Sequence, residues 1–317
     1  MDEMRAALFD RFGPPEVLYE GRVPVPRIRP DEVLVRVHAS SVNGGELHGR
    51  AGRVRLVTGR RFPQRTGLDF VGEIAEVGTS VTEPRKGTAV WGILPRRMGS
   101  MAEYVAVRPR QLSAAPAGLT PVEAVSVLAG GTPGITALRD KARLGPGDRL
   151  LVRGVGGVGS VAVQLGKVYG AHVTALAGAR NRDFVHGLGA DEVLDHRTTR
   201  PSELGSFDVI LDTVGTQHRA FRKLLAPGGR MVAIAFDPGH IATSTAYILA
   251  SAVHGSGRVR FFSGNPRHDL LAELARMAET GDIRPVVDTV RPLAELAAAH
   301  SALEAGGVRG KHVIRIL

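Results

Sequence analysis

The chain has 317 residues, of which 43% are hydrophobic, enough for two domains with full cores. It contains no cysteine, which excludes disulfides, cysteine-ligated zinc, iron–sulfur clusters and thiol nucleophiles. The formal net charge of +10 would suit a polyanionic partner if the basic residues were clustered, but they occur singly or in pairs. We therefore expect a solvated basic surface and no nucleic-acid partner.

The start of the chain, MDEMRAALFDRFGPPEVL, has early acidic residues and lacks the basic start and apolar run of a secretory signal. No apolar run elsewhere is long enough to cross a bilayer. We therefore expect a cytoplasmic protein with no membrane partner.

The N-terminal part has the pattern of short strands separated by Gly-Pro and Pro-rich turns. Glycines among β-branched residues are typical of bent or bulged strands. The predicted strand segments are RAALFDRF, GPPEVL, VPVPRIRPDEVLVRVHASSV, GLDFVGEIAEVGTSV, GTAVWGIL and MAEYVAV. The pattern then changes to two predicted helices, TPVEAVSVLAGG and TPGITALRDKARL, with Thr120 as N-cap and Pro121 at the first helical position.

Strands and helices alternate from Asp148 onward, which predicts a parallel, doubly wound sheet. The predicted strands are DRLLVRG, AHVTALAG, DEVLD, FDVILDTVG and GGRMVAIAF, and the helices between them are GGVGSVAVQLGKVYG, NRDFVHGLG and TQHRAFRKLLA. A strand RVRFF, an amphipathic helix HDLLAELARMAETG and short strands around an Ala-rich helix follow.

The strongest motif, GVGGVG, follows the apolar strand LLV and opens a helix. In a dinucleotide site, such glycines allow a tight turn, close approach of the backbone to the pyrophosphate, and packing of helix on strand. The helix N-terminus favours the phosphate charge. The predicted cofactor-binding residues here are Gly154, Gly156, Gly157, Val158 and Gly159.

The end of the next strand indicates which dinucleotide is bound. An NAD site usually has an acidic residue there for the ribose 2′-hydroxyl, whereas this chain has Gly178, Arg180 and Arg182 before its first acid, Asp183. The two arginines would attract a 2′-phosphate. The alternative is that they are a solvated helix start, although the helix dipole does not favour arginine there. We therefore expect NADPH to be the cofactor.

Over nearly its whole length the chain resembles the medium-chain dehydrogenase/reductase family. The matching segments include MRAALFDRFGPPEVL, EVLVRVHASSVN, FPQRTGLDFVGEIAEVG, GITALRDKARLGPGDRLLVRGVGGVGSVAVQLGK, LGADEVLDHR and AAAHSALEAGGVRGKHVIRIL, in the family's order. The resemblance implies an α/β protein with a GroES-like β-rich catalytic domain and a Rossmann domain with a doubly wound parallel sheet. The expected boundaries are 1–127 and 263–317 for the catalytic domain and 128–262 for the NADP-binding Rossmann domain.

Zinc dehydrogenases of this family carry Gly-His-Glu where this chain has Gly67-Leu68-Asp69. Because the histidine and the cysteine ligands are absent, we expect no metal site. The resemblance narrows to the zinc-free quinone oxidoreductase branch, which includes zeta-crystallin. The branch's Val-Asn-Pro-x-Asp stretch has Gly44 in place of Pro and Glu46 in place of Asp, while Asn43 matches.

The resemblance also implies further cofactor contacts. His196 stands where the branch often has a tyrosine against the 2′-phosphate, and a protonated His196 would pair with that phosphate. Asn43 and Thr136 match positions that line the nicotinamide half, and Lys311 matches a Gly-Lys near the C-terminus that can approach the cofactor. Val214 and Gly215 match a turn at the adenosine ribose, and Ala235, Phe236, Phe261 and Phe262 match segments flanking the nicotinamide and the cleft.

The implied reaction is hydride transfer from NADPH to a quinone or an α,β-unsaturated carbonyl, a small-molecule substrate, without zinc. Asn43 and Glu46 are the candidate catalytic residues, for donating a hydrogen bond and relaying a proton, with His48 in the same loop. Structural roles for Glu46, His48 and Tyr104 stay open. Asp69 and Asp212 are interpreted as a turn residue and a strand end, not as a catalytic pair.

Two alternatives remain: an NADPH-binding protein with little turnover, or an enoyl-reductase-like tailoring enzyme of secondary metabolism. The family resemblance also implies a homodimer through the edge strand near RVRFF, since apolar edge strands need cover.

Overall fold

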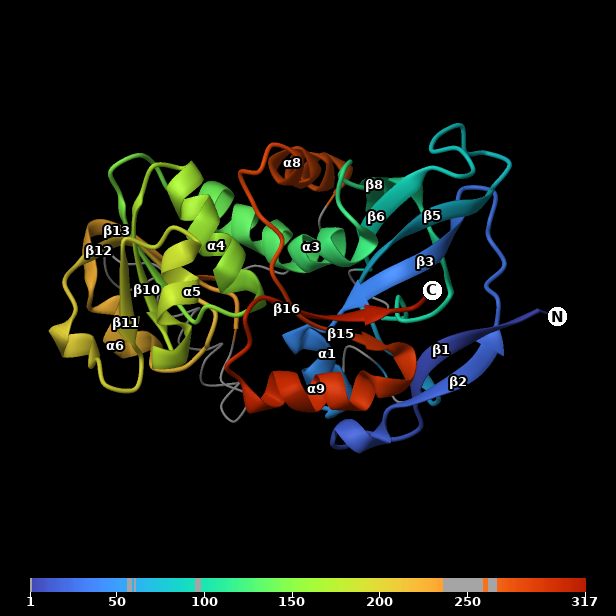
Figure 1. Cartoon of the computed structure of the whole chain (residues 1–317), viewed down its shortest axis with the longest axis horizontal. Helices are drawn as coiled ribbons and strands as arrows, with labels where there is room; N and C mark the ends of the chain where they lie inside the picture. Colours follow the sequence, from blue (N-terminus) through green and yellow to red (C-terminus); the bar gives the residue numbers. More distant parts are fainter. Residues whose placement is uncertain (1, 56–58, 60, 95–97, 236–258, 262–266) are drawn as a thin grey trace. The chain divides into compact units, whose positions relative to one another are not determined.

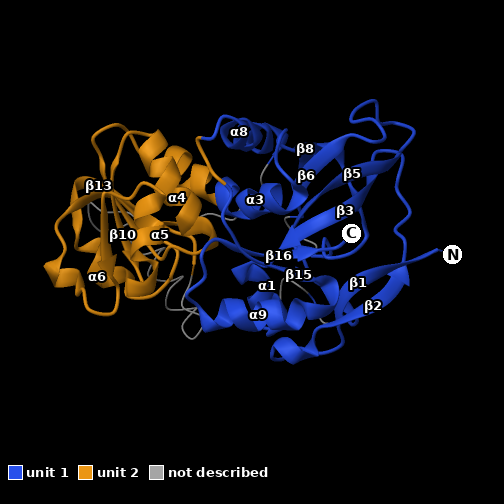
Figure 2. Ribbon diagram, viewed as in Figure 1, with its two compact units in different colours: residues 1–132, 265–281, 285–317 blue, residues 133–264, 282–284 orange. Residues whose placement is uncertain are grey.

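The computed structural model describes residues 2–55, 59, 61–94, 98–235, 259–261 and 267–317. Two compact units form the chain (Figures 1 and 2). Unit 1 comprises residues 1–132, 265–281 and 285–317, and unit 2 comprises residues 133–264 and 282–284. No helix among the described residues is long and apolar enough to cross a membrane.

Unit 2 contains one six-stranded sheet in the order β11-β10-β9-β12-β13-β14, in which all pairs of neighbours are parallel. The central residues of its inner strands are buried and mostly apolar, as expected of a sheet covered on both faces. This confirms the predicted doubly wound parallel sheet. The strands are β9 (Arg149–Arg153), β10 (His172–Ala177), β11 (Glu192–Asp195), β12 (Phe207–Asp212), β13 (Leu225–Ala233) and β14 (Val259–Phe261).

Unit 1 is rich in β-structure, as predicted. A three-stranded sheet in the order β2-β1-β4 consists of β1 (Glu3–Phe9), β2 (Tyr19–Pro24) and β4 (Gln64–Arg65). A seven-stranded sheet has the order β15-β16-β3-β5-β6-β8, and β7 pairs with β3. Its strands are β3 (Val33–Ser41), β5 (Asp69–Val77), β6 (Ala89–Ile93), β7 (Tyr104–Val107), β8 (Leu112–Ala114), β15 (Val287–Pro292) and β16 (Lys311–Arg315).

The antiparallel pairing of β16 with β3 joins the two ends of the chain in one sheet. It places Val313 opposite Ser41, and so brings Lys311, two residues before Val313, near the turn that follows β3. The α-helices among the described residues are α1 (Gly44–Arg50), α3 (Pro121–Ile135), α4 (Gly157–Val168), α5 (Arg182–Gly187), α6 (His218–Arg222), α8 (His268–Glu279) and α9 (Leu296–Ala305).

Several predicted elements were wrong in detail. GPPEVL is not a strand, because Pro15–Val17 form a 3-10 turn with proline at the helical start. The two predicted helices after Thr120 are one helix, α3, continued by a π-helix at Thr136–Lys141. Thr120 does cap α3, exchanging hydrogen bonds with Glu123.

Two further segments differ from the prediction. The segment that contains Glu46 and His48, which we expected to be a loop, forms helix α1. Asn43, directly before it, has the extended backbone conformation typical of an N-cap residue. The helix predicted over TQHRAFRKLLA ends at Arg222, and its last residues already belong to β13, which pairs with β12 from Leu225 on.

Candidate functional site

The glycine motif lies where β9 ends and α4 begins in unit 2. Gly154 has a φ of +85°, and a Cβ built there would lie 2.6 Å from Thr213 Oγ1. A Cβ on Gly159 would overlap the carbonyl oxygen of Gly154, so only glycine lets the helix approach the strand end. A Cβ on Gly156 would meet nothing within 4 Å, which leaves open space over the loop. The loop thus has the shape of a dinucleotide cradle at a helix N-terminus.

Changing Gly159 to alanine is expected to destabilise the protein by about 1–3 kcal/mol through overpacking and to weaken the binding of a nicotinamide dinucleotide. The added methyl must push Gly154 and α4 apart. NADPH fluorescence titration and urea unfolding measure the two effects. Gly187→Ala, in helix α5 with open space at its Cβ, is the matched control and should bind NADPH normally; unchanged binding by the Gly159 variant would contradict the cradle assignment.

A buried ion pair ties the glycine loop to the loop after β12. Arg153 Nη1 donates to both carboxylate oxygens of Asp212, at 3.2 and 3.3 Å, and Arg153 Nη2 donates to Thr216 Oγ1 at 2.9 Å. The Arg153 guanidinium lies over the Phe221 ring at 4.1 Å. Asp212 Oδ1 also accepts from the amides of Val214 and Gly215, at 2.9 and 3.2 Å. Asp212 therefore stabilises the turn that we expect at the adenosine ribose. Its position at the end of a strand did not by itself predict this role.

The residues expected at the 2′-phosphate lie at the carboxyl edge of β10 and β11. The amide of His196 donates to Ala177 O at 3.1 Å, and the ring lies beside Gly178. Arg180 lies in a 3-10 turn and Arg182 opens α5, and both are exposed. Because β10 and β11 are parallel neighbours, Arg180 and Arg182 after β10 and His196 after β11 lie at the same edge of the sheet.

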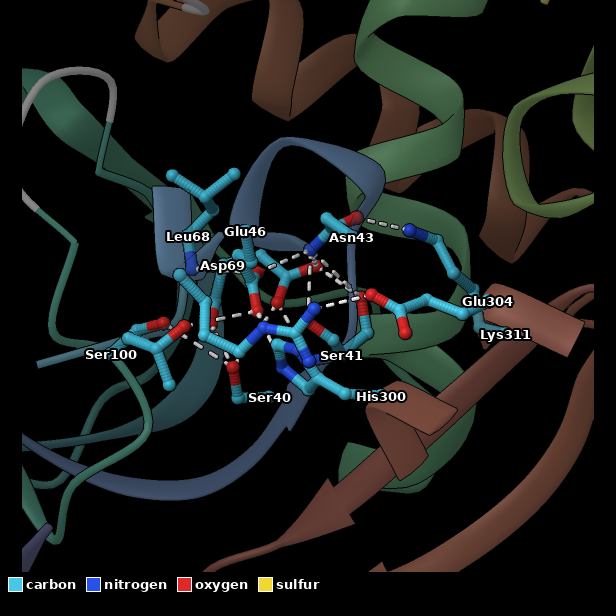
Figure 3. Close-up of polar contacts among 12 residues, drawn as sticks. Ser40, Ser41, Asn43, Glu46, Leu68, Asp69, Ser100, His300, Glu304 and Lys311 are labelled. Atoms are coloured by element: carbon cyan, nitrogen blue, oxygen red, sulfur yellow. Dashed lines mark hydrogen bonds and ion pairs between the residues drawn. The ribbon is translucent and has the colours of Figure 1, made fainter. Parts of the chain in front are cut away.

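In unit 1, a buried cluster is formed by the polar side chains of Asn43, Glu46, Asp69 and Lys311 (Figure 3). Asn43 Nδ2 donates to Glu46 Oε1 at 3.0 Å and to Ser41 O at 2.9 Å, and Asn43 Oδ1 accepts from Lys311 Nζ. Glu46 Oε1 also accepts from the Leu68 amide at 3.2 Å. The last member, Asp69, accepts from the Ser41 amide at 2.7 Å. Asp69 is thus bound to β3 rather than placed in a glycine turn, which corrects our interpretation of it.

Burial governs the charges of this cluster. Burial and the neighbouring Asp69 carboxylate raise the pKa of Glu46 to about 8. Burial also raises the pKa of Asp69, against the opposing effect of Lys311. Burial lowers the pKa of Lys311, although both carboxylates favour its charged form. The two carboxyl groups and the ammonium therefore titrate as one coupled group, in which the raised pKa of Glu46 favours its protonated form at neutral pH.

Known proteins match the chain along both units. Residues 29–117 match the family described as "Alcohol dehydrogenase GroES-like domain", and residues 188–314 match "Zinc-binding dehydrogenase". The "NADPH-dependent alkenal/one oxidoreductase, chloroplastic" of Arabidopsis thaliana is 31% identical, over 98% of this chain and 79% of that protein. The "Chloroplast envelope quinone oxidoreductase homolog" of the same plant is 30% identical, over 92% of each. The solved structure of the quinone oxidoreductase from Coxiella burnetii has a TM-score of 0.91 at 29% identity and covers 100% of both chains.

The chain belongs to the medium-chain dehydrogenase/reductase family. Within that family its relatives are quinone oxidoreductase-like members, so the predicted family, fold class and oxidoreductase activity are confirmed. Several relatives are named as NAD(P)H or NADPH-dependent oxidoreductases, which supports a nicotinamide cofactor for this chain. The cradle fits such a cofactor, since Gly154 and Gly159 allow the tight turn and the close packing of the helix on the strand end, and Gly156 leaves open space over the loop.

The zinc of other medium-chain dehydrogenases does not fit the residues present. Leu68, at the histidine ligand position, has no donor atom in its side chain, and the carboxylate of Asp69 is engaged by Ser40 and Ser41. Within the described part of the chain, no group of three or more histidine, aspartate or glutamate side chains is arranged to hold a metal ion. We therefore derive no chemistry through zinc.

The other predicted site residues lie at several places in the fold. Thr136 opens the π-helix and is half-buried, and Val214 is exposed while Gly215 is buried. Ala235 follows β13, and Phe261 ends β14, whereas Phe236 and Phe262 lie outside the described residues. His48 Nδ1 lies 3.5 Å from Arg53 Nη1 at the end of α1. Sequence reasoning missed Arg153, although a charged residue ending an apolar strand directly before the glycine motif is a visible signal.

Proposed function

We propose that the protein is an NADPH-dependent reductase that transfers hydride to quinones or α,β-unsaturated carbonyl compounds without zinc. The observation that carries this proposal is the buried cluster of Asn43, Glu46 and Lys311 beside Leu68, where zinc members have a metal ligand. A site without a metal needs hydrogen-bond donors and a proton source of its own. The cluster contains both.

NADPH, when bound, supplies the hydride, which adds to the β-carbon of the unsaturated carbonyl while the π electrons move to the carbonyl oxygen. In this proposal the Asn43 amide and the Lys311 ammonium are the donors that stabilise the developing oxyanion. The acid proton of Glu46 then passes to the α-carbon, and Glu46 recovers a proton from solvent. A carboxyl group whose pKa is raised by burial and by the Asp69 carboxylate suits this task, because its protonated form is favoured at pH 7.

Oxidation of NADPH and NADH by the purified, EDTA-treated protein tests the proposal. The acceptor panel comprises quinones, 2-alkenals, cyclic enones, a 2-enoyl thioester and saturated ketones. We expect turnover of quinones or enones with NADPH and no effect of EDTA, while saturated ketones stay unreduced. EDTA-sensitive oxidation of simple alcohols would overturn the zinc-free assignment, and preference for the enoyl thioester would favour a tailoring enzyme.

The proposed preference of the protein for NADPH over NADH is based on the exposed side chains of Arg180 and Arg182 after β10. Arg180→Ala is expected to raise KM for NADPH by about 10- to 100-fold, since a hydrogen bond to a charged group is worth about 1.5–3 kcal/mol, and to leave KM for NADH unchanged. Steady-state kinetics with both cofactors measure the shift. Arg276→Ala, an exposed arginine on α8, carries the same charge change as a control. Equal losses with both cofactors would contradict a 2′-phosphate contact.

A binding protein with little turnover is the second candidate. Its support is that the Asn43 amide already donates to Glu46 and accepts from the Lys311 ammonium, so substrate must displace these contacts. Tight NADPH binding without turnover of any acceptor in the panel would favour it. The cytoplasmic location and the homodimer through β14 remain predictions, and light scattering at several protein concentrations tests the latter.

A further inference from the structure

Helix α1 begins with two glycines that its own geometry does not require. Gly44 and Gly45 are its first two residues, although glycine stabilises a helix less than alanine does. Neither glycine has a positive φ. A Cβ on Gly44 would meet no described residue within 4 Å, and a Cβ on Gly45 would meet only Leu68 Cδ1, at an ordinary contact distance of 3.5 Å. The described surroundings would therefore accept a larger residue at either position.

The residue before the two glycines does not stabilise the helix either. Asn43 stands at the N-cap position, but its side chain makes no capping hydrogen bond. Its Nδ2 donates to Ser41 O and Glu46 Oε1, and its Oδ1 accepts from Lys311 Nζ. The start of α1 is thus organised around the polar cluster rather than around helix stability, and the missing side chains call for an explanation at the site.

The two glycines lie at the exposed edge of this cluster. Asn43 is 9% exposed and Lys311 is 5% exposed, whereas Gly44 and Gly45 are exposed and Leu68 is half-buried. The Leu68 amide donates into the cluster, while its branched side chain points away from it (Figure 3). A molecule bound at the exposed edge of the cluster therefore meets bare backbone and one aliphatic side chain.

We propose that the Gly44–Gly45 turn selects the shape of the hydride acceptor, and that its missing side chains make room for a ring at the reacting carbonyl, as in a quinone or a cyclic enone. The inference rests on the proposed function, in which the acceptor oxygen binds to Asn43 and Lys311. A ring is wide on both sides of its carbonyl carbon, whereas a 2-alkenal has only a hydrogen on one side. Only the ring needs the space that the glycines leave beside Asn43. Bare backbone and the Leu68 methyl groups suit its apolar face.

Filling the space tests the proposal through the ratio of two rates. Gly45→Leu is expected to lower kcat/KM for 2-cyclohexenone and 1,4-naphthoquinone about 10- to 100-fold, because the new side chain lies beside Leu68, and to change kcat/KM for 2-hexenal less than about threefold. Gly44→Ala and Gly45→Ala should shift the ratio in the same direction by smaller factors. The KM for NADPH should stay as in the wild type.

Two controls separate the loss of space from other effects. Gly187→Leu, at an exposed position of α5 where a Cβ also meets no described residue within 4 Å, should leave all three rates unchanged. Urea unfolding should show that Gly45→Ala and Gly45→Leu are at least as stable as the wild type, since both residues form helices better than glycine. If the glycines were a hinge, ring and chain acceptors would lose rate equally, which would contradict the inference.

A binding measurement needs no turnover. With NADP⁺ in place of NADPH no hydride is available, and the ring current of bound 1,4-naphthoquinone should shift the NMR signals of the Leu68 methyl groups. The protein is labelled with ¹³C-methyl leucine, and the Leu68 signals are assigned by their loss in Leu68→Ile. The shift should be absent in Gly45→Leu at the same quinone concentration.

The inference and the proposed function fail separately. Leu68 signals that do not move, an unchanged ratio of ring to chain rates in Gly45→Leu, or a wild type that reduces 2-hexenal but neither ring acceptor would overturn the inference and leave the reductase intact. A wild type that reduces no acceptor contradicts the reductase, while the Leu68 signals still show whether a ring binds at the Gly44–Gly45 turn.

Discussion

Glu46→Gln is expected to lower kcat for enone or quinone reduction by about 10²- to 10⁴-fold, the usual contribution of a positioned general acid. Glutamine keeps the side-chain shape and an Oε1 acceptor for Asn43 and the Leu68 amide, but it has no acidic proton. The KM for NADPH should change little, because the cradle for its phosphates is in unit 2.

The pH dependence gives this prediction a second readout. The active form of Glu46 is protonated, and burial with the Asp69 carboxylate raises its pKa to about 8, so wild-type kcat should fall as the pH rises through about 8. Glu46→Gln should lack this limb. Glu76→Gln, an exposed glutamate on β5, is the matched control and should keep both the rate and the limb. A Glu46 variant with a rate near the wild type would rule out Glu46 as the proton donor.

Arg153→Met should reduce the free energy of unfolding by as much as about 3–5 kcal/mol, because it removes the arginine from a buried carboxylate that keeps only His218 Nε2, at 3.1 Å, and two backbone amides as partners. Asp212 is fully buried and Arg153 is 8% exposed, so solvent screens the lost interaction little. The change also removes the stacking on Phe221 and the donor to Thr216 that fixes the loop after β12. NADPH affinity should fall with stability, since that loop lies against Gly154.

Urea unfolding measures the loss, and two comparisons separate its causes. Arg149→Met, at the exposed start of the same strand, removes a guanidinium 5.8 Å from the Phe207 ring and should cost no more than about 1 kcal/mol. Arg153→Met combined with Asp212→Asn also removes the carboxylate charge that has lost its arginine and should recover part of the stability. If the single variant lost less than about 1 kcal/mol, the view that this pair holds the loop would be wrong.

Much of unit 2 could be predicted because its signals are local. An apolar strand, a glycine motif and a helix follow one another within residues 149–168, and the sheet confirms that order. Predictions were poorer where one pattern fits two structures. GPPEVL is apolar and short, but its prolines favour a turn, and TQHRAFRKLLA is helical by composition while pairing with β12 draws its end into β13.

The candidate site in unit 1 was only partly visible in the sequence. Asn43 and Glu46 were found by resemblance, and Lys311 was assigned to the cofactor without its partner. Lys311 donates to Asn43 across 268 residues of chain, and Arg50 to Glu304 across 254. No local spacing encodes such pairs, because β16 must first pair with β3 and α9 must pack against α1.

The sequence by itself determined the family, the two kinds of sheet, the glycine cradle and the absence of cysteine ligands. These depend on residue type and on spacing along the backbone, which fix turns, strand periodicity and donor atoms. Only the tertiary structure decided that burial raises the pKa of Glu46, that Asp69 is bound to β3, and that His300 lies beside Glu46. A pKa depends on the water removed and on the charges that distant segments bring within a few ångströms, and both exist only once the chain has folded.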